Sequence, residues 1–261
     1  MSRLIPEGFK PEKKCLKDRV IVVTGGANGI GAAACRTFAA QGATVVLMDK
    51  NVECLKTLYD EIEDAGHPQP AIYPLDFEGA KEDDYNELAI VLDREFGRID
   101  GLLHNAARRD PHTPLWKIDL EDWYEILQVN LNAPYMLTRA CMDLLNKAPS
   151  ASVIFTTDHQ SRKHHAYWGA YGVSKHALDG LMLTFADELE NQSPIRVNAI
   201  DPGAVRTNMR VTSFPGIKPE EMTDPMDIMD TYMYLMCDAS KQENGYTFWA
   251  QKSDTDPTTA V

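Results

Sequence analysis

The sequence places Tyr171 four residues before Lys175. Residues with this spacing lie on one face of a helix, so the two side chains are neighbours if the segment is helical. An ammonium group beside a phenol favours the phenolate and lowers the tyrosine pKa from about 10 toward the range of a general acid or base. The pair indicates proton-transfer chemistry, although the same spacing also occurs as plain surface decoration.

A glycine-rich turn near the start of the chain indicates a second kind of chemistry. The apolar run 20–24 opens into a turn with Gly25, Gly29 and Gly31, and an alanine-rich helical segment follows. Glycines let the backbone approach a pyrophosphate, whose charge meets the N–H groups at the start of the helix, around Asn28 and Ile30. The G-x-x-x-G-x-G spacing differs from the G-x-G-x-x-G fingerprint, but the strand-turn-helix order is the same. We expect a dinucleotide site, the alternative being a turn without a ligand.

Asp49 ends the second apolar run, twenty positions after Gly29. A carboxylate at this place accepts hydrogen bonds from an adenosine ribose and repels a 2′-phosphate. We therefore expect NAD to be preferred and NADP to be possible, because Lys50 next to it could turn toward a phosphate. The alternative is that Asp49 is only a polar strand end.

The elements that must position these residues alternate along the chain. Apolar runs predict buried strands at 20–24, 44–48, 71–75, 101–104, 152–156 and 195–200. Helical patterns cover 29–40, 52–64, 84–96, 120–146 with a kink at Pro134, 170–190 and 226–237. The alternation predicts an α/β fold with a doubly wound, mostly parallel, Rossmann-like sheet and helices on both faces. Ligands of such sheets bind at the carboxyl ends of the strands, and the loop 202–225 beside that cleft is a candidate lid.

Composition narrows the class of protein. The chain has 261 residues and a formal net charge of −13, which argues against nucleic acid and anionic membranes as partners. Five scattered cysteines predict neither disulfides nor a zinc site, and the adjacent histidines 164 and 165 match no metal spacing, so we expect no metal. We expect one catalytic domain over 20–252, an N-terminal extension over 1–19 and a flexible tail over 253–261. Without a visible export signal, a cytoplasmic location is expected.

Taken together, these motifs resemble the short-chain dehydrogenase/reductase family. The resemblance covers nearly the whole chain, and the run 168–171 is similar to a bacterial branch related to 3-oxoacyl reductases. It rests on the glycine turn, the tyrosine-lysine pair and five further positions or pairs, namely Thr24, Asp76, Asn105-Ala106, Asn130 and Pro202-Gly203.

The resemblance implies an oxidoreductase that moves a hydride between NAD(H) and a secondary alcohol or ketone. Tyr171 would exchange a proton with the substrate oxygen, Lys175 would hold the ribose, and Asn130 would steady a long helix and a water that relays protons. The remaining positions would contact the coenzyme: Asp76 at the adenine, Asn105 and Ala106 at the ribose, and Pro202, Gly203 and Thr207 at the nicotinamide. A small-molecule substrate and a homodimer or homotetramer are implied as well.

One position departs from the family pattern. Asp158 stands thirteen residues before Tyr171, where the family usually has a serine that polarises the substrate oxygen. An ionised carboxylate cannot donate a proton and would raise the pKa of Tyr171. Asp158 could be protonated and act as a donor, Thr157 or His159 could replace the hydroxyl, or catalysis could be impaired. The last possibility leaves a dinucleotide-binding sensor or interaction protein as the alternative function.

Basic residues follow two of the predicted strands. Arg108, Arg109 and His112 come after the fourth strand, and the basic segment 162–165 comes after the fifth. Positive charge beside the cleft of an acidic protein favours an anionic or acyl-linked substrate, the alternative being solvated loop charges.

An epimerase of related fold is disfavoured, because the first two glycines of that class are usually separated by two residues, whereas Gly25 and Gly29 are separated by three.

Overall fold

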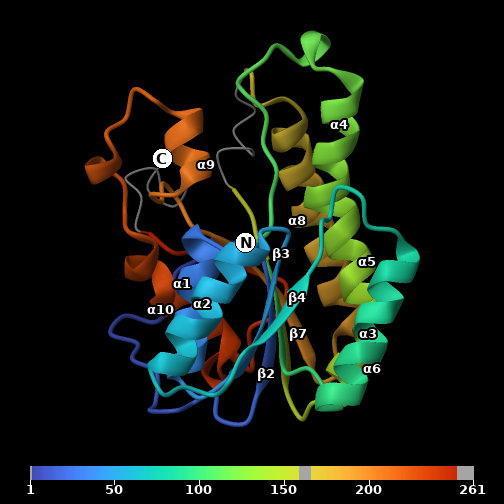
Figure 1. Ribbon diagram of the computed structural model, residues 1–261, viewed down its shortest axis with the longest axis vertical. Coiled ribbons are helices and arrows are strands. Elements are labelled where there is room, and N and C mark those ends of the chain that lie inside the picture. Colours follow the sequence, from blue (N-terminus) through green and yellow to red (C-terminus); the bar gives the residue numbers. More distant parts are fainter. Residues whose placement is uncertain (1, 159–165, 252–261) are drawn as a thin grey trace.

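The computed structural model describes residues 2–158 and 166–251 and contains one parallel sheet. Its strand order is β1-β8-β7-β6-β5-β2-β3-β4 (Figure 1). The strands are β1 Ser2–Arg3, β2 Val20–Thr24, β3 Thr44–Asp49, β4 Ala71–Pro74, β5 Gly101–His104, β6 Ala151–Thr156, β7 Ile195–Asp201 and β8 Thr247–Trp249. The predicted α/β fold with a parallel sheet is confirmed.

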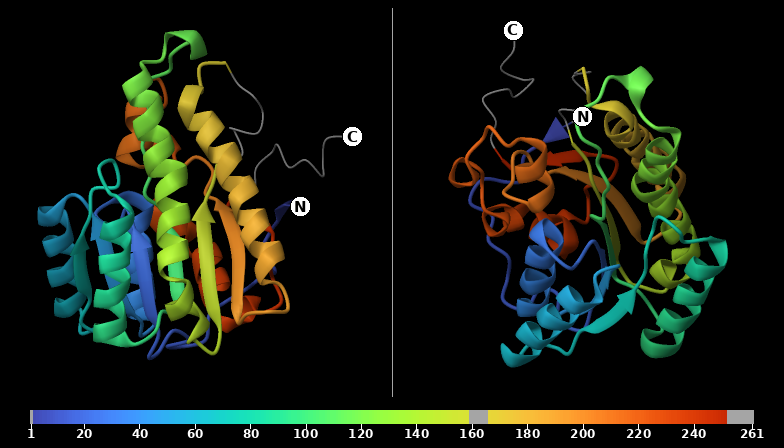
Figure 2. Two further views of the ribbon diagram at one scale, coloured as in Figure 1. Left: turned by 90° about the vertical axis from the view of Figure 1, so that its right-hand side faces the viewer. Right: turned by 45° about the horizontal axis from the view of Figure 1, so that its top comes forward.

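The central strands are apolar because both of their faces are covered. Every residue of β5, β6 and β7 is buried, as expected for a parallel sheet between two layers of helices. One core cluster packs α1, α2 and α10 on one face, and a second packs α3, α5 and α8 on the other (Figure 1). In Figure 2, α4 and α5 run beside α8 over this second face, in agreement with the contacts between α4 and α8.

Four helices begin and end within two residues of the predicted bounds, namely α1 Gly29–Ala40, α2 Val52–Asp64, α3 Glu82–Phe96 and α8 Gly169–Leu189. The other α-helices of the described ranges are α4 Leu120–Leu127, α5 Ala133–Ala140, α6 Met142–Asn146, α9 Asn208–Ser213 and α10 Met229–Met236, the last of which is shorter than the predicted helix 226–237. Single turns of 3₁₀-helix lie at Leu115–Lys117, Pro219–Glu221, Pro225–Ile228 and Asp238–Ser240. Gly97 ends α3 in the left-handed conformation, with φ of 73°, which glycine adopts without strain. Among these helices of the described ranges, none is both long and apolar enough to cross a membrane.

The predicted helix 120–146 is not one continuous α-helix. A π-helical segment, Gln128–Asn132, separates α4 from α5, and α6 follows after Cys141. Pro134 is the second residue of α5 and has no N–H for the carbonyl four residues earlier, so the regular hydrogen-bond pattern cannot pass through this point. The change in helix geometry coincides with the predicted kink.

Two further predictions differ from the structure. The segment 202–225 is not a plain loop, because α9 forms where the hydroxyl of Thr207 accepts a hydrogen bond from the Arg210 N–H and caps the helix. The N-terminal extension contributes β1, in which Ser2 and Arg3 pair with β8. Strands of two and three residues carry no readable periodicity, so neither β1 nor β8 was predicted. The predicted tail from 253 lies outside the described residues.

Candidate active site

The loops at the carboxyl ends of the strands surround a pocket of about 420 Å³. The loops after β2, β3, β4, β5, β6 and β7 all contribute, together with α8 and α9. Almost all of the predicted site residues line this pocket: Gly25, Asn28, Gly29, Ile30, Asp49, Asp76, Asn105, Ala106, Asp158, Tyr171, Lys175, Pro202, Gly203 and Thr207. Asn130 and Gly31 lie behind its wall.

The glycine turn is packed too closely for any other residue. A Cβ atom on Gly31 would lie 2.0 Å from the carbonyl oxygen of Gly25, and one on Gly25 would lie 2.8 Å from Cα of Ala106. Asn105 closes the other side, because its Nδ2 donates to the carbonyl oxygens of Thr24 and Gly25 at 3.3 and 3.2 Å. This cradle brings the β2 and β5 loops together at the start of α1.

The start of α1 is suited to an anion. Asn28 is its N-cap residue, and in the described part of the chain its side chain makes no capping hydrogen bond. The first N–H groups of a helix have no partner within the helix, so those after Asn28 can meet a pyrophosphate. Together with the glycine cradle, this arrangement fits a dinucleotide.

Asp49 and Lys50 lie at the end of β3, on the side of the pocket where the ribose of a dinucleotide would bind. The Asp49 carboxylate accepts hydrogen bonds from the N–H groups of Ala27 at 3.3 Å and Asn51 at 3.0 Å. Lys50 is drawn to other acids, since its Nζ lies 2.9 Å from Glu78 and 3.9 Å from Asp76. Glu78, which sequence reasoning missed, therefore restrains the lysine that was expected to be able to turn toward a phosphate.

Tyr171 and Lys175 lie on the first turns of α8, and both side chains are buried. The phenol of Tyr171 donates to Oδ2 of Asp158 at 3.2 Å. Nζ of Lys175 donates to the carbonyl oxygen of Thr156 at 2.8 Å and lies 5.7 Å from the centre of the Tyr171 ring. The predicted proximity of the two side chains is present, with Asp158 as a third member of the group.

The electrostatics of this group differ from the expected lowering of the tyrosine pKa. Burial raises the pKa of Tyr171 well above its ordinary value, and the Asp158 carboxylate raises it further, while Arg109 acts in the opposite direction. Asp158 therefore raises the pKa of Tyr171 as expected, whereas the net lowering of this pKa that was expected from Lys175 is not found. Burial also lowers the pKa of Lys175 to about 8, although Asp158 and Asp179 favour its charged form. With this pKa Lys175 is still mostly protonated near neutral pH, but it loses its charge at a lower pH than an ordinary lysine does.

Thr157, one of the residues that could replace the missing serine hydroxyl, is not free to bond to a substrate. The hydroxyl of Thr157 donates to Oδ1 of Asp179 at 2.8 Å, so it is already committed within the protein. His159, the other candidate, lies outside the described residues, as does the basic segment 162–165. Asp158 itself lines the pocket next to Tyr171.

Asn130 contacts neighbouring structure and not the pocket. It lies in the π-helical segment, where its Oδ1 accepts from the Arg108 N–H at 2.7 Å and its Nδ2 donates to the Arg108 carbonyl oxygen at 2.9 Å. The same Nδ2 donates to Oγ of Ser174 at 2.9 Å, and that hydroxyl donates to the Tyr171 carbonyl oxygen. Asn130 thus joins the β5 loop to α8, which agrees with a role in steadying the helices.

The residues after β7 that we predicted to contact the coenzyme are held by contacts within the protein. The Gly203 N–H donates to Oδ1 of Asp201 at 2.9 Å, and Nε2 of Gln251 donates to the Pro202 carbonyl oxygen at 2.7 Å. Thr207 caps α9 and packs against the glycine turn, because a Cβ on Gly29 would lie 3.1 Å from its methyl group.

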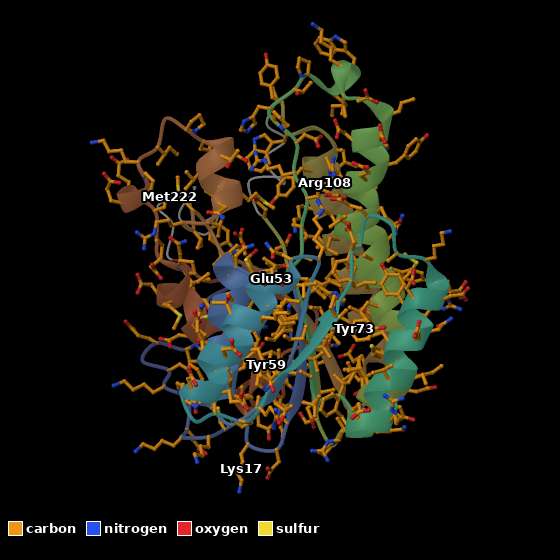
Figure 3. All side chains as sticks on the ribbon, in the orientation of Figure 1. Lys17, Glu53, Tyr59, Tyr73, Arg108 and Met222 are labelled. Carbon is orange, nitrogen blue, oxygen red and sulfur yellow. The ribbon has the colours of Figure 1, made fainter. Side chains whose placement is uncertain are left out.

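The two arginines after β5 have different surroundings. Arg108, labelled in Figure 3 beside α4, contacts Glu78 at 3.0 Å, Asp122 at 2.9 Å and Glu125 at 2.6 Å. Arg109 lies over the rings of Trp168 and Tyr171, at 4.4 and 4.8 Å from their centres.

Arg210 of α9 also lines the pocket, and sequence reasoning missed it. It stands in a segment without periodicity, where the only available signal was the Thr207 cap. The tertiary structure brings this arginine to the side of the pocket that holds Arg109. Within the described ranges, no group of three acidic, histidine or cysteine side chains is arranged to hold a metal ion.

Comparisons with known proteins agree with this geometry. A family model described as short chain dehydrogenase matches residues 19–218. The oxidoreductase YciK of Escherichia coli K12 is 39% identical over 243 residues, which cover 93% of this chain and 96% of that protein. A 3-oxoacyl-[acyl-carrier-protein] reductase of Thermotoga maritima is more distant, at 29% identity over 88% of this chain and 95% of that protein.

Solved structures match nearly the whole chain. A short chain dehydrogenase from Pseudomonas syringae superimposes with a TM-score of 0.91 at 48% identity, covering 93% of this chain and 98% of that one. One from E. coli CFT073, complexed with NADPH, gives a TM-score of 0.90 at 40% identity, covering 93% of this chain and the whole of that one.

Proposed function

The chain belongs to the short-chain dehydrogenase family, and on that premise we propose that it transfers a hydride between NAD(H) and a secondary alcohol or ketone that carries an anionic group. The observation that supports this most is the convergence of Tyr171, Lys175 and the glycine cradle on one pocket. A dinucleotide bound in this pocket would supply or accept the hydride.

Tyr171, Lys175 and Asp158 would take part in the proton transfer to and from the substrate oxygen. Tyr171 gives its phenolic proton to a ketone oxygen during reduction and takes a proton from the alcohol during oxidation. Lys175, held by the Thr156 carbonyl, contributes positive charge beside Tyr171 and would hold the ribose hydroxyls of the coenzyme. Asp158 accepts a hydrogen bond from Tyr171, so during oxidation it can take the phenolic proton as Tyr171 takes the substrate proton.

We propose that NAD is preferred over NADP. Asp49 lines the pocket and would repel a 2′-phosphate, while Glu78 keeps Lys50 from compensating. The E. coli CFT073 relative was crystallised with NADPH, so NADP is the competing coenzyme. Titration of the protein with NAD and NADP by calorimetry decides between them, and tighter binding of NADP would contradict the preference.

The activity itself requires a substrate screen. NAD(P)-linked turnover is to be measured against a panel of ketones and secondary alcohols for the native protein, for Tyr171→Phe and for Asp158→Ser. We expect activity that Tyr171→Phe abolishes. Failure to bind either dinucleotide would remove the proposal.

The alternative function is a dinucleotide-binding sensor without efficient catalysis. The raised pKa of Tyr171 beside Asp158 favours it, because a tyrosine that resists ionisation is a poor base. Tight dinucleotide binding with no turnover on the panel, and a large gain of ketone reduction in Asp158→Ser, would support this alternative. A homodimer or homotetramer and a cytoplasmic location stay predictions.

A further inference from the structure

Two arginines from distant parts of the chain lie beside the same aromatic ring at the wall of the pocket. Arg109 follows β5 and Arg210 belongs to α9. The guanidinium carbon of Arg109 lies 5.0 Å from the centre of the Phe214 ring, and that of Arg210 lies 3.9 Å from it. Arg109 also lies 4.8 Å from the centre of the Tyr171 ring, so this positive cluster adjoins the residue proposed to exchange the proton.

The cluster lacks the carboxylate partners that neutralise Arg108. Of the ion pairs between described residues, none includes Arg109 or Arg210. Arg109 donates instead to Nε2 of His112 at 2.8 Å, and Nε of Arg210 is buried with no hydrogen-bond partner in the described part of the chain. Half-buried guanidinium groups that form no ion pair with a carboxylate favour a site that an anion completes.

The pKa of Arg109 reflects burial and charged neighbours of both signs. Burial lowers the pKa of Arg109, and Arg210 lowers it further, while Tyr171, Asp158 and Asp110 act in the opposite direction. An anionic group near both guanidiniums would relieve their repulsion, and its oxygens would meet the N–H groups of Arg109 and Arg210.

We propose that Arg109 and Arg210 bind an oxyanion of the substrate, a carboxylate or a phosphate, only a few bonds from the carbon that reacts. The inference rests on the proposed function, because it takes Tyr171 as the residue that faces the reacting oxygen. Short keto acids and keto phosphates are the simplest molecules that present both groups.

The first measurement is of binding without turnover. The protein saturated with NAD⁺, which cannot reduce a ketone, is titrated by calorimetry with 4-oxopentanoate and with its methyl ester. Hydroxyacetone phosphate and hydroxyacetone form the second pair. We expect at least one anion to bind about tenfold or more tightly than its neutral partner, as expected for charge-assisted hydrogen bonds. The pair with the larger difference tells whether the site takes a carboxylate or a phosphate.

The variants Arg109→Met and Arg210→Met test the assignment. Each should weaken binding of the preferred anion about tenfold and leave its neutral partner and NAD⁺ nearly unchanged. Arg206→Met is the matched control, because Arg206 is exposed, pairs with Asp224 and does not line the pocket. It should bind every probe like the native protein.

Equal binding of the anion and its neutral partner in both pairs, including no binding of either, would overturn the inference. Equal loss of anion and NAD⁺ binding in both methionine variants would overturn it too, because the arginines would then hold coenzyme phosphates. If the proposed function itself is wrong, the native protein binds neither NAD⁺ nor NADP⁺, and this result differs from each of the outcomes above.

Discussion

The phenol of Tyr171 donates a hydrogen bond to Oδ2 of Asp158, 3.2 Å away. A serine, which the resemblance leads one to expect at position 158, would offer a neutral hydroxyl, whereas an ionised carboxylate opposes formation of the phenolate. Asp158 therefore makes Tyr171 harder to ionise, in addition to the effect of burial, while Arg109 acts in the opposite direction.

Asp158→Ser should lower the pKa of Tyr171, because it removes the carboxylate that opposes ionisation. The direction follows because the phenolate would no longer face a negative charge at hydrogen-bond distance. Nuclear magnetic resonance of ¹³C-labelled tyrosine reports this pKa directly, also when turnover is absent. Asp187→Ser, at an exposed position of α8, is the control. An unchanged Tyr171 pKa in Asp158→Ser would show that the carboxylate does not govern this group.

Lys175 should make the stability depend on pH. Its pKa is about 8 in the folded protein, while the unfolded value is about 10.5, so between these values the unfolded chain binds more protons. The free energy of unfolding should therefore rise with pH across this window, by roughly 3 kcal/mol from this group. Below pH 8 the full cost of burying the ammonium is present.

The measurement compares the native protein with Lys175→Met by denaturant unfolding from pH 7 to pH 10.5. Raised pKa values of buried thiols such as Cys141 act in the opposite direction at high pH, but they are common to both proteins and cancel in the difference. The free energy of unfolding of Lys175→Met, relative to that of the native protein, should decrease as the pH rises. A difference that stays constant with pH would contradict the low pKa of Lys175.

Gly31→Ala should disturb the cradle, because the added Cβ would lie 2.0 Å from the Gly25 carbonyl oxygen and backbone would have to move. We expect a loss of about 1–3 kcal/mol of stability and at least about tenfold weaker dinucleotide binding. Gly180→Ala is the matched control inside α8, since nothing lies within 4 Å of its Cβ position. That variant should be as stable as the native protein or up to about 1 kcal/mol more stable. Equal affinity of Gly31→Ala for the dinucleotide would argue against binding at this turn.

Glu78→Gln should shift the coenzyme preference toward NADP, because it releases Lys50 beside Asp49. The pair is partly exposed, so we expect the ratio of NADP to NAD affinity to rise only about two- to fivefold. Glu53, labelled in Figure 3, forms a more exposed ion pair with Lys56 on α2, so Glu53→Gln should leave the ratio unchanged. If both variants change the ratio equally, the effect is one of net charge and not of Lys50.

The sequence by itself determined the alternation of strands and helices, the glycine turn and the shared helix face of Tyr171 and Lys175. These features follow from local rules, since periodicity decides which runs are buried and glycine alone fits the close approach at Gly31. The same rules bounded α1 and α2 at both ends.

Only the tertiary structure decided what surrounds these residues. The Thr157 hydroxyl bonds to Asp179, and Arg108 pairs with acids from the loop after β4 and from α4. Asn130 bonds to the backbone of Arg108 and does not line the pocket. Arg210 lies beside the same aromatic ring as Arg109. The pKa of a buried group depends on burial and on charges that are distant in sequence, and no local pattern encodes either. The fold and the close-packed glycine turn could therefore be predicted, whereas the charges around Tyr171 depend on the tertiary structure.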